Sequence, residues 1–177
     1  NNKNQIVGKG APNFQQNEVI MLEYNNIKQS LNLLRKNKKK ISGLIVEPIQ
    51  ASCPTIQSEN YIKSIYNFCK KNKIYIIFDE IITGLRTKKL SVCKNLNLVP
   101  DIITFAKIFG GGLPIGICCI EKNLNKKLNK LNKKVFFGGT FSGNPFSSAV
   151  GLNTFKYIKK NELKIFYHIE MISNYIE

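Results

Sequence analysis

Lys107 lies in an unusual setting for a lysine of this chain. The segment DIITFAKIFGGGLPIGICCI, residues 101–120, surrounds it with apolar side chains and follows it closely with a run of glycines. An ammonium costs several kcal/mol to bury unless it is paired or deprotonated, so a lysine at the end of a buried strand tends to be neutral. A neutral amine is a nucleophile, and we therefore predict covalent chemistry with an aldehyde at Lys107.

Two further polar segments can complete such a site. Asp79 and Glu80 end the apolar run KIYIIFDE, residues 73–80, and Thr140 lies in GGTFSGNP, residues 138–145. If the aldehyde is that of pyridoxal phosphate, the chemistry needs an acid beside the pyridine nitrogen, and Asp79 can supply it. The phosphate of that cofactor needs amide donors at a helix N-terminus and a nearby hydroxyl, and residues 138–145 offer both.

The rest of the chain predicts the elements that position these residues. Short apolar runs alternate with segments of helical periodicity, which is typical of an α/β protein with a mostly parallel sheet flanked by helices. In such sheets, ligands bind beyond the carboxyl ends of the strands. Ser58 and Asn144 are the expected helix caps. We expect strands at residues 18–24, 42–48, 73–80, 100–107 and 113–122, and helices at residues 25–37, 58–72, 124–131, 145–160 and after 161.

The composition limits the class of protein. With 177 residues, 43% of them hydrophobic, the chain can form one core of ordinary domain size. Its five cysteines form no CxxC pair and its single histidine leaves little for a zinc site, so we expect reduced thiols and no metal. No apolar run reaches the roughly 18 residues of a membrane span. We expect a cytoplasmic protein and, because no initiating Met is present, an internal fragment of a longer one.

The sequence allows two other interpretations. The net charge of +16 can indicate a nucleic-acid partner. However, the lysines come in Asn- and Ile-rich runs such as LLRKNKKK, without interleaved stacking aromatics, so solvated helix faces explain them better. The run IYIIFDE also fits the metal-binding strand of a nucleotide hydrolase, but no GxxxxGK[ST] loop precedes it. Taken singly, Lys107 can be an exposed turn residue and TFSGNP only a helix cap.

Three motifs, in this order and spacing, resemble those of the class III aminotransferases, which are fold type I pyridoxal-phosphate enzymes. They are IIFDEIITGLR, PDIITFAKIFGGGLPIG and GGTFSGNP. The likeness is closest to the glutamate-1-semialdehyde 2,1-aminomutase branch. Because GLIVEPIQ and GKGAPNF also fit, the resemblance covers nearly the whole chain.

The resemblance implies a role for each candidate residue. Lys107 would form the Schiff base with the cofactor and act as general acid and base, and Asp79 would pair with the pyridine nitrogen. Ile81 would pack against the ring. Thr140 matches the position that reaches the cofactor phosphate of the neighbouring subunit, which implies a homodimer with a shared active site. Ser52, a further candidate cofactor-binding residue, stands where the aminomutase pattern has Asn.

The resemblance also implies a function. We predict an aminotransferase that passes an amino group, through the Lys107 Schiff base, between a small-molecule donor and a keto or aldehyde acceptor in a biosynthetic pathway. The alternative is glutamate-1-semialdehyde 2,1-aminomutase, which transfers the amino group within one molecule for tetrapyrrole synthesis. Ile82 is apolar as in the aminomutase branch, whereas many transaminases of the family carry Gln there. Ser52 departs from the aminomutase pattern, so both activities stay open.

The family pattern divides the chain unequally. We expect residues 1–160 to form the central and C-terminal part of the cofactor-binding large domain, and residues 161–177 to form a helix leading toward a small domain. The upstream half of the large domain, with its phosphate loop, and the small domain lie outside this sequence. We therefore expect this piece alone to be inactive.

Overall fold

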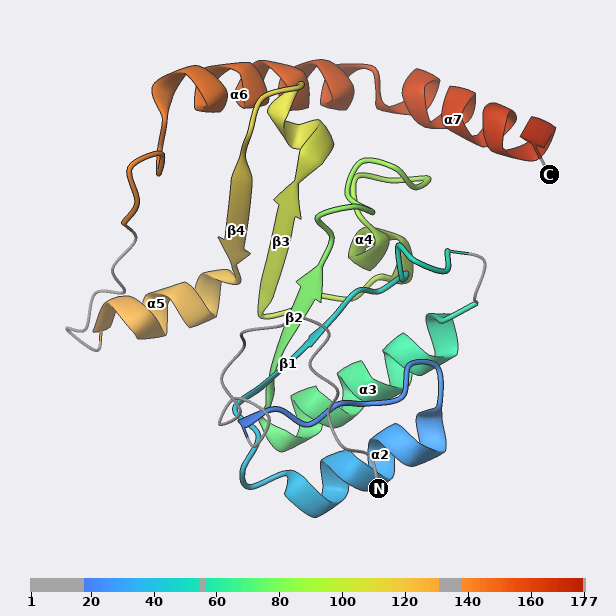
Figure 1. The fold of residues 1–177 in the computed structure, drawn as a ribbon, viewed down its shortest axis with the longest axis vertical. Helices are drawn as coiled ribbons and strands as arrows, with labels where there is room; N and C mark the ends of the chain where they lie inside the picture. The colour runs from blue at the N-terminus through green and yellow to red at the C-terminus, as the bar shows by residue number, and fades with distance from the viewer. Residues whose placement is uncertain (1–17, 55–56, 131–137, 177) are drawn as a thin grey trace, which may run out of the picture.

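The computed structural model describes residues 18–54, 57–130 and 138–176, and forms one mixed sheet with helices around it (Figure 1). The strand order is β1-β2-β3-β4. The pairs β1–β2 and β2–β3 are parallel, whereas β4 runs antiparallel to β3. The predicted α/β class with a mostly parallel sheet is confirmed. The strands are β1 (Gly43–Val46), β2 (Tyr75–Asp79), β3 (Ile102–Ala106) and β4 (Gly116–Ile120).

The helices follow the predicted segments closely. The periodic positions Ile62, Ile65 and Cys69 of α3 are fully buried against the sheet, which explains why this amphipathic segment is helical. The helices are α2 (Ile27–Asn37), α3 (Glu59–Asn72), α4 (Val92–Leu96), α5 (Lys122–Lys130), α6 (Pro145–Lys160) and α7 (Glu162–Ile176), with a 3₁₀ turn η1 (Lys107–Gly110). Leu131, expected on the α5 segment, lies outside the described residues, as does the GKGAPNF motif.

One predicted strand is wrong: residues 18–24 contain no β-strand. Only Leu22 and Tyr24 of this run pack against the core of α2, α3 and β1. The Tyr24 hydroxyl also donates to the carbonyl oxygens of Glu47 and Pro48, at 3.1 Å each. The other large apolar side chains of the run are 39–59% exposed, so its composition predicted neither the element nor the burial of most of its residues.

The two expected helix caps behave differently. Asn144 accepts a hydrogen bond from the Ser147 amide at 3.1 Å and caps α6 as predicted. Ser58 stands at the N-cap of α3, but its hydroxyl donates to the Pro48 carbonyl at 2.7 Å and makes no cap bond. Ser58 therefore ties the β1–α3 connection to the helix instead of satisfying the helix amides.

A second, smaller apolar cluster joins α6 and α7 to the sheet. Leu85, Phe109, Ile158 and Phe166 are its buried members. Figure 1 shows α6 and α7 running across the end of the sheet at which β3 ends. Of the two helices, α6 packs against the turn that begins with Lys107. None of the helices in the described part of the chain is long and apolar enough to cross a membrane.

Candidate functional site

Asp79 is the last residue of β2 and is held by two donors. Its Oδ1 accepts a hydrogen bond from the Thr104 hydroxyl at 3.1 Å and from the Ile81 amide at 3.0 Å. Thr104 is the register partner of Asp79 on β3, so the neighbouring strand itself supplies one donor. Within the described residues no donor reaches Oδ2. The carboxylate is therefore fixed through one oxygen and keeps the other available for a ligand.

Lys107 directly follows β3 and begins η1. Its backbone has a φ of 53°, in the left-handed region that a residue with a side chain rarely adopts. Its side chain is exposed, so the expected burial among apolar neighbours is wrong: the strand residues are packed, but the chain turns one residue later. Strained backbone of this kind costs about 1–3 kcal/mol and clusters at functional sites.

The turn after Lys107 is clamped against α6. Gly111 has a φ of 58°, and a Cβ atom there would overlap the Thr154 hydroxyl. From the other side, a Cβ on Gly151 of α6 would lie 2.9 Å from the Phe109 carbonyl oxygen. The close packing of η1 on α6 therefore requires glycine at both positions, and this contact fixes where Lys107 emerges from the sheet.

Lys107 and Thr140 line one open groove of about 1100 Å³. Cys118 of β4 and residues of the segment before α6 also line it. Thr140 is exposed, so its hydroxyl is accessible to a ligand. The groove brings together an amine and a hydroxyl that are far apart in sequence. Asp79 is not among its lining residues, although it lies at the carboxyl end of the strand next to β3.

The start of α6 offers fewer phosphate donors than expected. Pro145, its first residue, has no amide hydrogen, and the Ser147 amide is already bonded to Asn144. Of the two features expected in residues 138–145, the hydroxyl of Thr140 remains freely exposed, whereas the helix N-terminus is largely satisfied by its own cap.

The remaining candidate residues follow the carboxyl ends of β1 and β2. Ile81 is half-buried and takes part through its amide, which donates to Asp79. Ile82 and Ser52 are exposed, and Ser52 lies in the turn between β1 and α3. Neither of these two lines the groove that contains Lys107. In the described residues, no group of three or more His, Cys, Asp and Glu side chains is arranged to hold a metal ion.

Glu80 has contacts that the sequence did not assign. Its side chain is fully buried, and its carboxylate accepts hydrogen bonds from the amides of Val92 at 2.7 Å and Cys93 at 2.9 Å. The Thr83 hydroxyl donates to it at 3.3 Å. Burial raises the pKa of this carboxyl, while the amide donors oppose the rise. The only sequence signal was a second carboxylate directly after an apolar strand.

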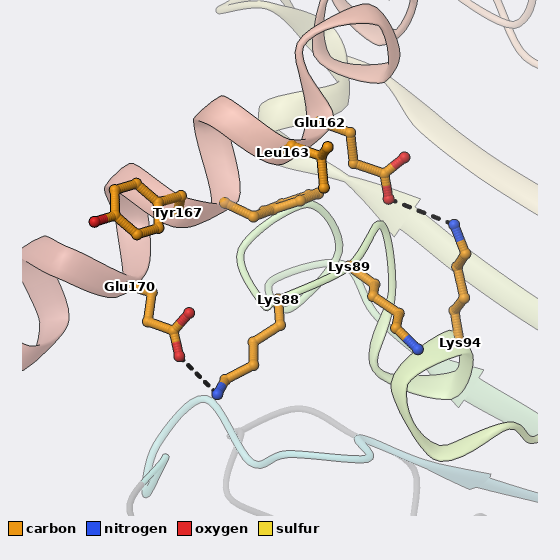
Figure 2. Close-up of a pocket in the computed structure, with 8 residues that line it drawn as sticks. Lys88, Lys89, Lys94, Glu162, Leu163, Tyr167 and Glu170 are labelled. Carbon is orange, nitrogen blue, oxygen red and sulfur yellow. Dashed lines mark hydrogen bonds and ion pairs between the residues drawn. The ribbon is translucent and has the colours of Figure 1, made fainter.

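A second cavity, of about 390 Å³, lies between α7 and the loop that follows Glu80. Figure 2 shows Lys88 reaching Glu170 and Lys94 reaching Glu162 across it. The nitrogen–oxygen distances are 2.6 and 3.4 Å. Both pairs are substantially exposed, so each contributes little to stability. They connect α7 to the loop that follows Glu80, through Lys88, and to α4, through Lys94.

The lysine-bearing turn and the carboxylate lie at the carboxyl ends of neighbouring strands of one α/β sheet, and the family follows from comparison. Residues 5–174 match the family model described as "Aminotransferase class-III", and the chain belongs to that family. The family depends on pyridoxal phosphate. A taurine:2-oxoglutarate aminotransferase from Bifidobacterium kashiwanohense, solved in complex with PLP and glutamate, is similar over 76% of this chain and 30% of its own, at 25% identity and a TM-score of 0.68.

The named relatives point to two kinds of chemistry. Glutamate-1-semialdehyde 2,1-aminomutase of Clostridium beijerinckii is 34% identical over 95% of this chain and 39% of its own length. The protein "Glutamate-1-semialdehyde 2,1-aminomutase 2" of Lachnoclostridium phytofermentans is 32% identical over 86% of this chain and 36% of its own. A transaminase from the marine bacterium Virgibacillus shares the fold over 79% of this chain and 32% of its own, at 29% identity and a TM-score of 0.71. The chain thus spans 36–39% of the length of these two aminomutases.

Proposed function

We propose that this chain carries the cofactor-binding centre of a pyridoxal-phosphate-dependent aminotransferase, with Lys107 as the residue that holds the cofactor covalently. The observation that carries the proposal is the placement of Asp79 and Lys107 at the carboxyl ends of two neighbouring parallel strands. The surroundings of the two side chains support the proposal. One carboxylate oxygen of Asp79 is held by hydrogen bonds and the other is open, and the Lys107 side chain is exposed.

The residues present fit the cofactor. The open Oδ2 of Asp79 suits a protonated ring nitrogen, because a fixed carboxylate favours the charged form of a partner beside it. The exposed Lys107 amine suits an aldehyde. Thr140 offers a hydroxyl to a phosphate, and Ile81 an apolar side chain to a ring. Ser52 belongs to this proposal as a candidate cofactor ligand in the turn after β1, the strand that pairs with the Asp79 strand.

Each of these residues has a definable task. When bound, pyridoxal phosphate supplies an electron-accepting ring that stabilises negative charge on the substrate carbon next to the amine. Asp79 keeps a proton on the ring nitrogen, while Thr104 and Ile81 prevent its carboxylate from rotating. Lys107 Nζ would take up the proton that leaves the substrate carbon, as a general base, and would donate a proton later in the transfer, as a general acid.

The reaction proposed is transfer of an amino group from a donor to a separate keto or aldehyde acceptor. Intramolecular transfer, as in glutamate-1-semialdehyde 2,1-aminomutase, is the second candidate, because aminomutases of this name are 31–34% identical to the chain. The complete protein, supplied with glutamate 1-semialdehyde as its only substrate, separates the two. Turnover that requires both a donor and an acceptor supports the aminotransferase, and turnover with the semialdehyde alone selects the aminomutase. No turnover in either assay and no cofactor binding would refute both.

The proposal includes a homodimer in which Thr140 serves the cofactor phosphate of the partner subunit. Large apolar side chains on α6 and α7 support an interface there, since Tyr157, Leu163, Tyr167 and Tyr175 are 66–90% exposed. In the single chain, however, Thr140 and Lys107 share a groove. An experiment must therefore decide which subunit's cofactor Thr140 contacts.

Mixed dimers of the complete protein make that decision. If Thr140 serves the partner, combining Lys107→Ala chains with Thr140→Ala chains places both lesions in one site of each heterodimer and leaves the other intact. Activity then recovers on mixing. If Thr140 serves its own subunit, every heterodimer holds two damaged sites and activity stays lost. Mass spectrometry of differently tagged chains confirms that subunits have exchanged.

The setting of this enzyme follows from the same family membership. We propose a cytoplasmic location. We also propose that residues 1–160 belong to the cofactor-binding large domain, and that residues 161–177, which include α7, lead toward a further domain that contributes to substrate binding.

A further inference from the structure

Glu80 directly follows Asp79 and has a buried carboxylate. The proposed function gives Glu80 no task. Its side chain is 0% exposed. It accepts two backbone amide hydrogens and one hydroxyl, from Val92, Cys93 and Thr83. Because a buried charge without partners costs several kcal/mol, this set of donors is what makes its burial tolerable. A residue with this cost and this many partners is a candidate for more than packing.

The chemistry of this set of donors is specific for a carboxylate. The Val92 amide points to one oxygen and the Cys93 amide to the other. A glutamine of the same shape has only one carbonyl oxygen, so its NH₂ group would face one of the two amide donors. Glu80→Gln therefore breaks the arrangement while keeping the volume of the side chain.

These bonds close the loop of residues 81–91. The loop leaves the sheet at Glu80 and returns to the same carboxylate at the start of α4, 12 to 13 residues later. The Glu80 carbonyl also accepts from the Gly84 amide at 2.9 Å. Inside this closed loop, the Ile81 amide is one of the two donors that hold Asp79 Oδ1. The carboxylate of Glu80 thus fixes the backbone from which an Asp79 donor comes.

We propose that Glu80 is a positioning residue for the reaction: by closing the loop of residues 81–91 it fixes the Ile81 amide, and thereby holds the Asp79 carboxylate with Oδ2 toward the pyridine nitrogen. The proposal rests on the role proposed for Asp79. It assigns Glu80 no contact with substrate or cofactor.

Glu121 offers a matched control for the substitution. It also accepts two amides at the start of a helix, from Asn123 at 2.8 Å and Leu124 at 3.0 Å. It follows β4, which runs antiparallel to β3. Glu121 therefore lies at the end of the sheet where β3 begins, whereas Asp79 lies at the end where β2 and β3 finish. Both amides bond the same oxygen, Oε2, so a glutamine can keep both bonds through its carbonyl oxygen. Glu121→Gln therefore controls for the loss of a carboxylate charge at the start of a helix, at the end of the sheet away from Asp79.

The experiment compares Glu80→Gln, Glu121→Gln and Asp79→Asn in the complete protein. The decisive readout is the pH at which the absorbance of the bound cofactor reports loss of the ring-nitrogen proton. The second is the affinity of the cofactor-free protein for pyridoxal phosphate. For Glu80→Gln we expect the midpoint to fall by about one pH unit, a tenfold change in the proton equilibrium, and the affinity to fall about tenfold. For Glu121→Gln we expect both to stay within twofold of the unchanged protein.

A purely structural role would give a different result. Glu80→Gln would then lower the melting temperature, but in the folded protein the pH midpoint for loss of the ring-nitrogen proton would not change. This outcome overturns the proposal. If Asp79→Asn leaves the midpoint unchanged, the role of Asp79 itself is refuted, which is a separate failure. Should Glu80→Gln not fold, Thr83→Val removes only the hydroxyl donor. A two- to threefold change in the proton equilibrium of the ring nitrogen, in the same direction, supports the proposal, and no change overturns it.

Discussion

Replacing Gly111 by alanine tests how the turn after Lys107 is held against α6. Two costs add at this position. An L-residue at a φ of 58° costs about 1–2 kcal/mol relative to glycine. The new Cβ would also overlap the Thr154 hydroxyl and lie 3.1 Å from a methyl carbon of Val150, and overpacking of this kind costs typically about 1–3 kcal/mol.

We therefore expect Gly111→Ala to destabilise the protein by about 2–5 kcal/mol. Adding Thr154→Ala removes one of the two clashing atoms, so the double variant should regain part of the packing cost but none of the backbone cost. Gly116→Ala is the matched control, because a Cβ there meets nothing within 4 Å and its φ is not positive. Its stability should stay within about 0.5 kcal/mol of the unchanged protein.

The assay is the melting temperature of the cofactor-free protein for the four chains, measured side by side. The expected order is the unchanged protein and Gly116→Ala together, then the double variant, then Gly111→Ala. If Gly111→Ala melts with Gly116→Ala, the turn is not clamped as described. If Thr154→Ala restores nothing, the cost comes from the backbone alone and the proposed contact with α6 is wrong.

Three further predictions concern Asp79, Cys69 of α3 and Asp101. Asp79→Ala should lower turnover by orders of magnitude while the far-ultraviolet circular dichroism spectrum stays unchanged; unchanged turnover would remove Asp79 from the site. Burial, helped by the nearby Asp101 charge, raises the pKa of the Cys69 thiol from 9.0 to about 11, so the folded state holds this proton more tightly than the unfolded state. Stability should therefore fall as pH rises between these two values, with a shallower fall in Cys69→Ala, and equal slopes in both proteins would contradict this. Asp101→Ala should destabilise by about 1–3 kcal/mol in urea unfolding, because the Ile76 amide loses its acceptor at 2.8 Å; a neutral effect would show that water replaces it.

Much of the fold could be predicted because burial leaves a periodic trace in the sequence. The spacing of Ile62, Ile65, Phe68 and Cys69 predicted α3, in which Phe68 is half-buried and the other three are fully buried. Ligands bind beyond the carboxyl ends of parallel strands, and this rule predicted that Asp79 and Lys107 lie at the same end of the sheet. The rule needs only the positions at which strands end. Local signals of this kind are carried by residues close together in the chain.

The features that could not be predicted depend on distant partners. An apolar run has no direction, so the sequence of β4 did not reveal that it pairs antiparallel to β3. Residues 18–24 have strand-like composition but pack onto helices that the run itself does not specify. The role of Glu80 depends on amides 12 and 13 residues away, and the exposure of Lys107 depends on where the chain turns. Each of these requires three-dimensional contacts that no local pattern contains.

The central claim is that Lys107 is the residue that holds pyridoxal phosphate. Treating the complete, cofactor-loaded protein with borohydride, digesting it and sequencing the labelled peptide by mass spectrometry tests this directly. We expect the label on the peptide that contains Lys107, and no label in Lys107→Ala. A label of equal extent on another lysine, or one that persists in Lys107→Ala, would contradict the assignment.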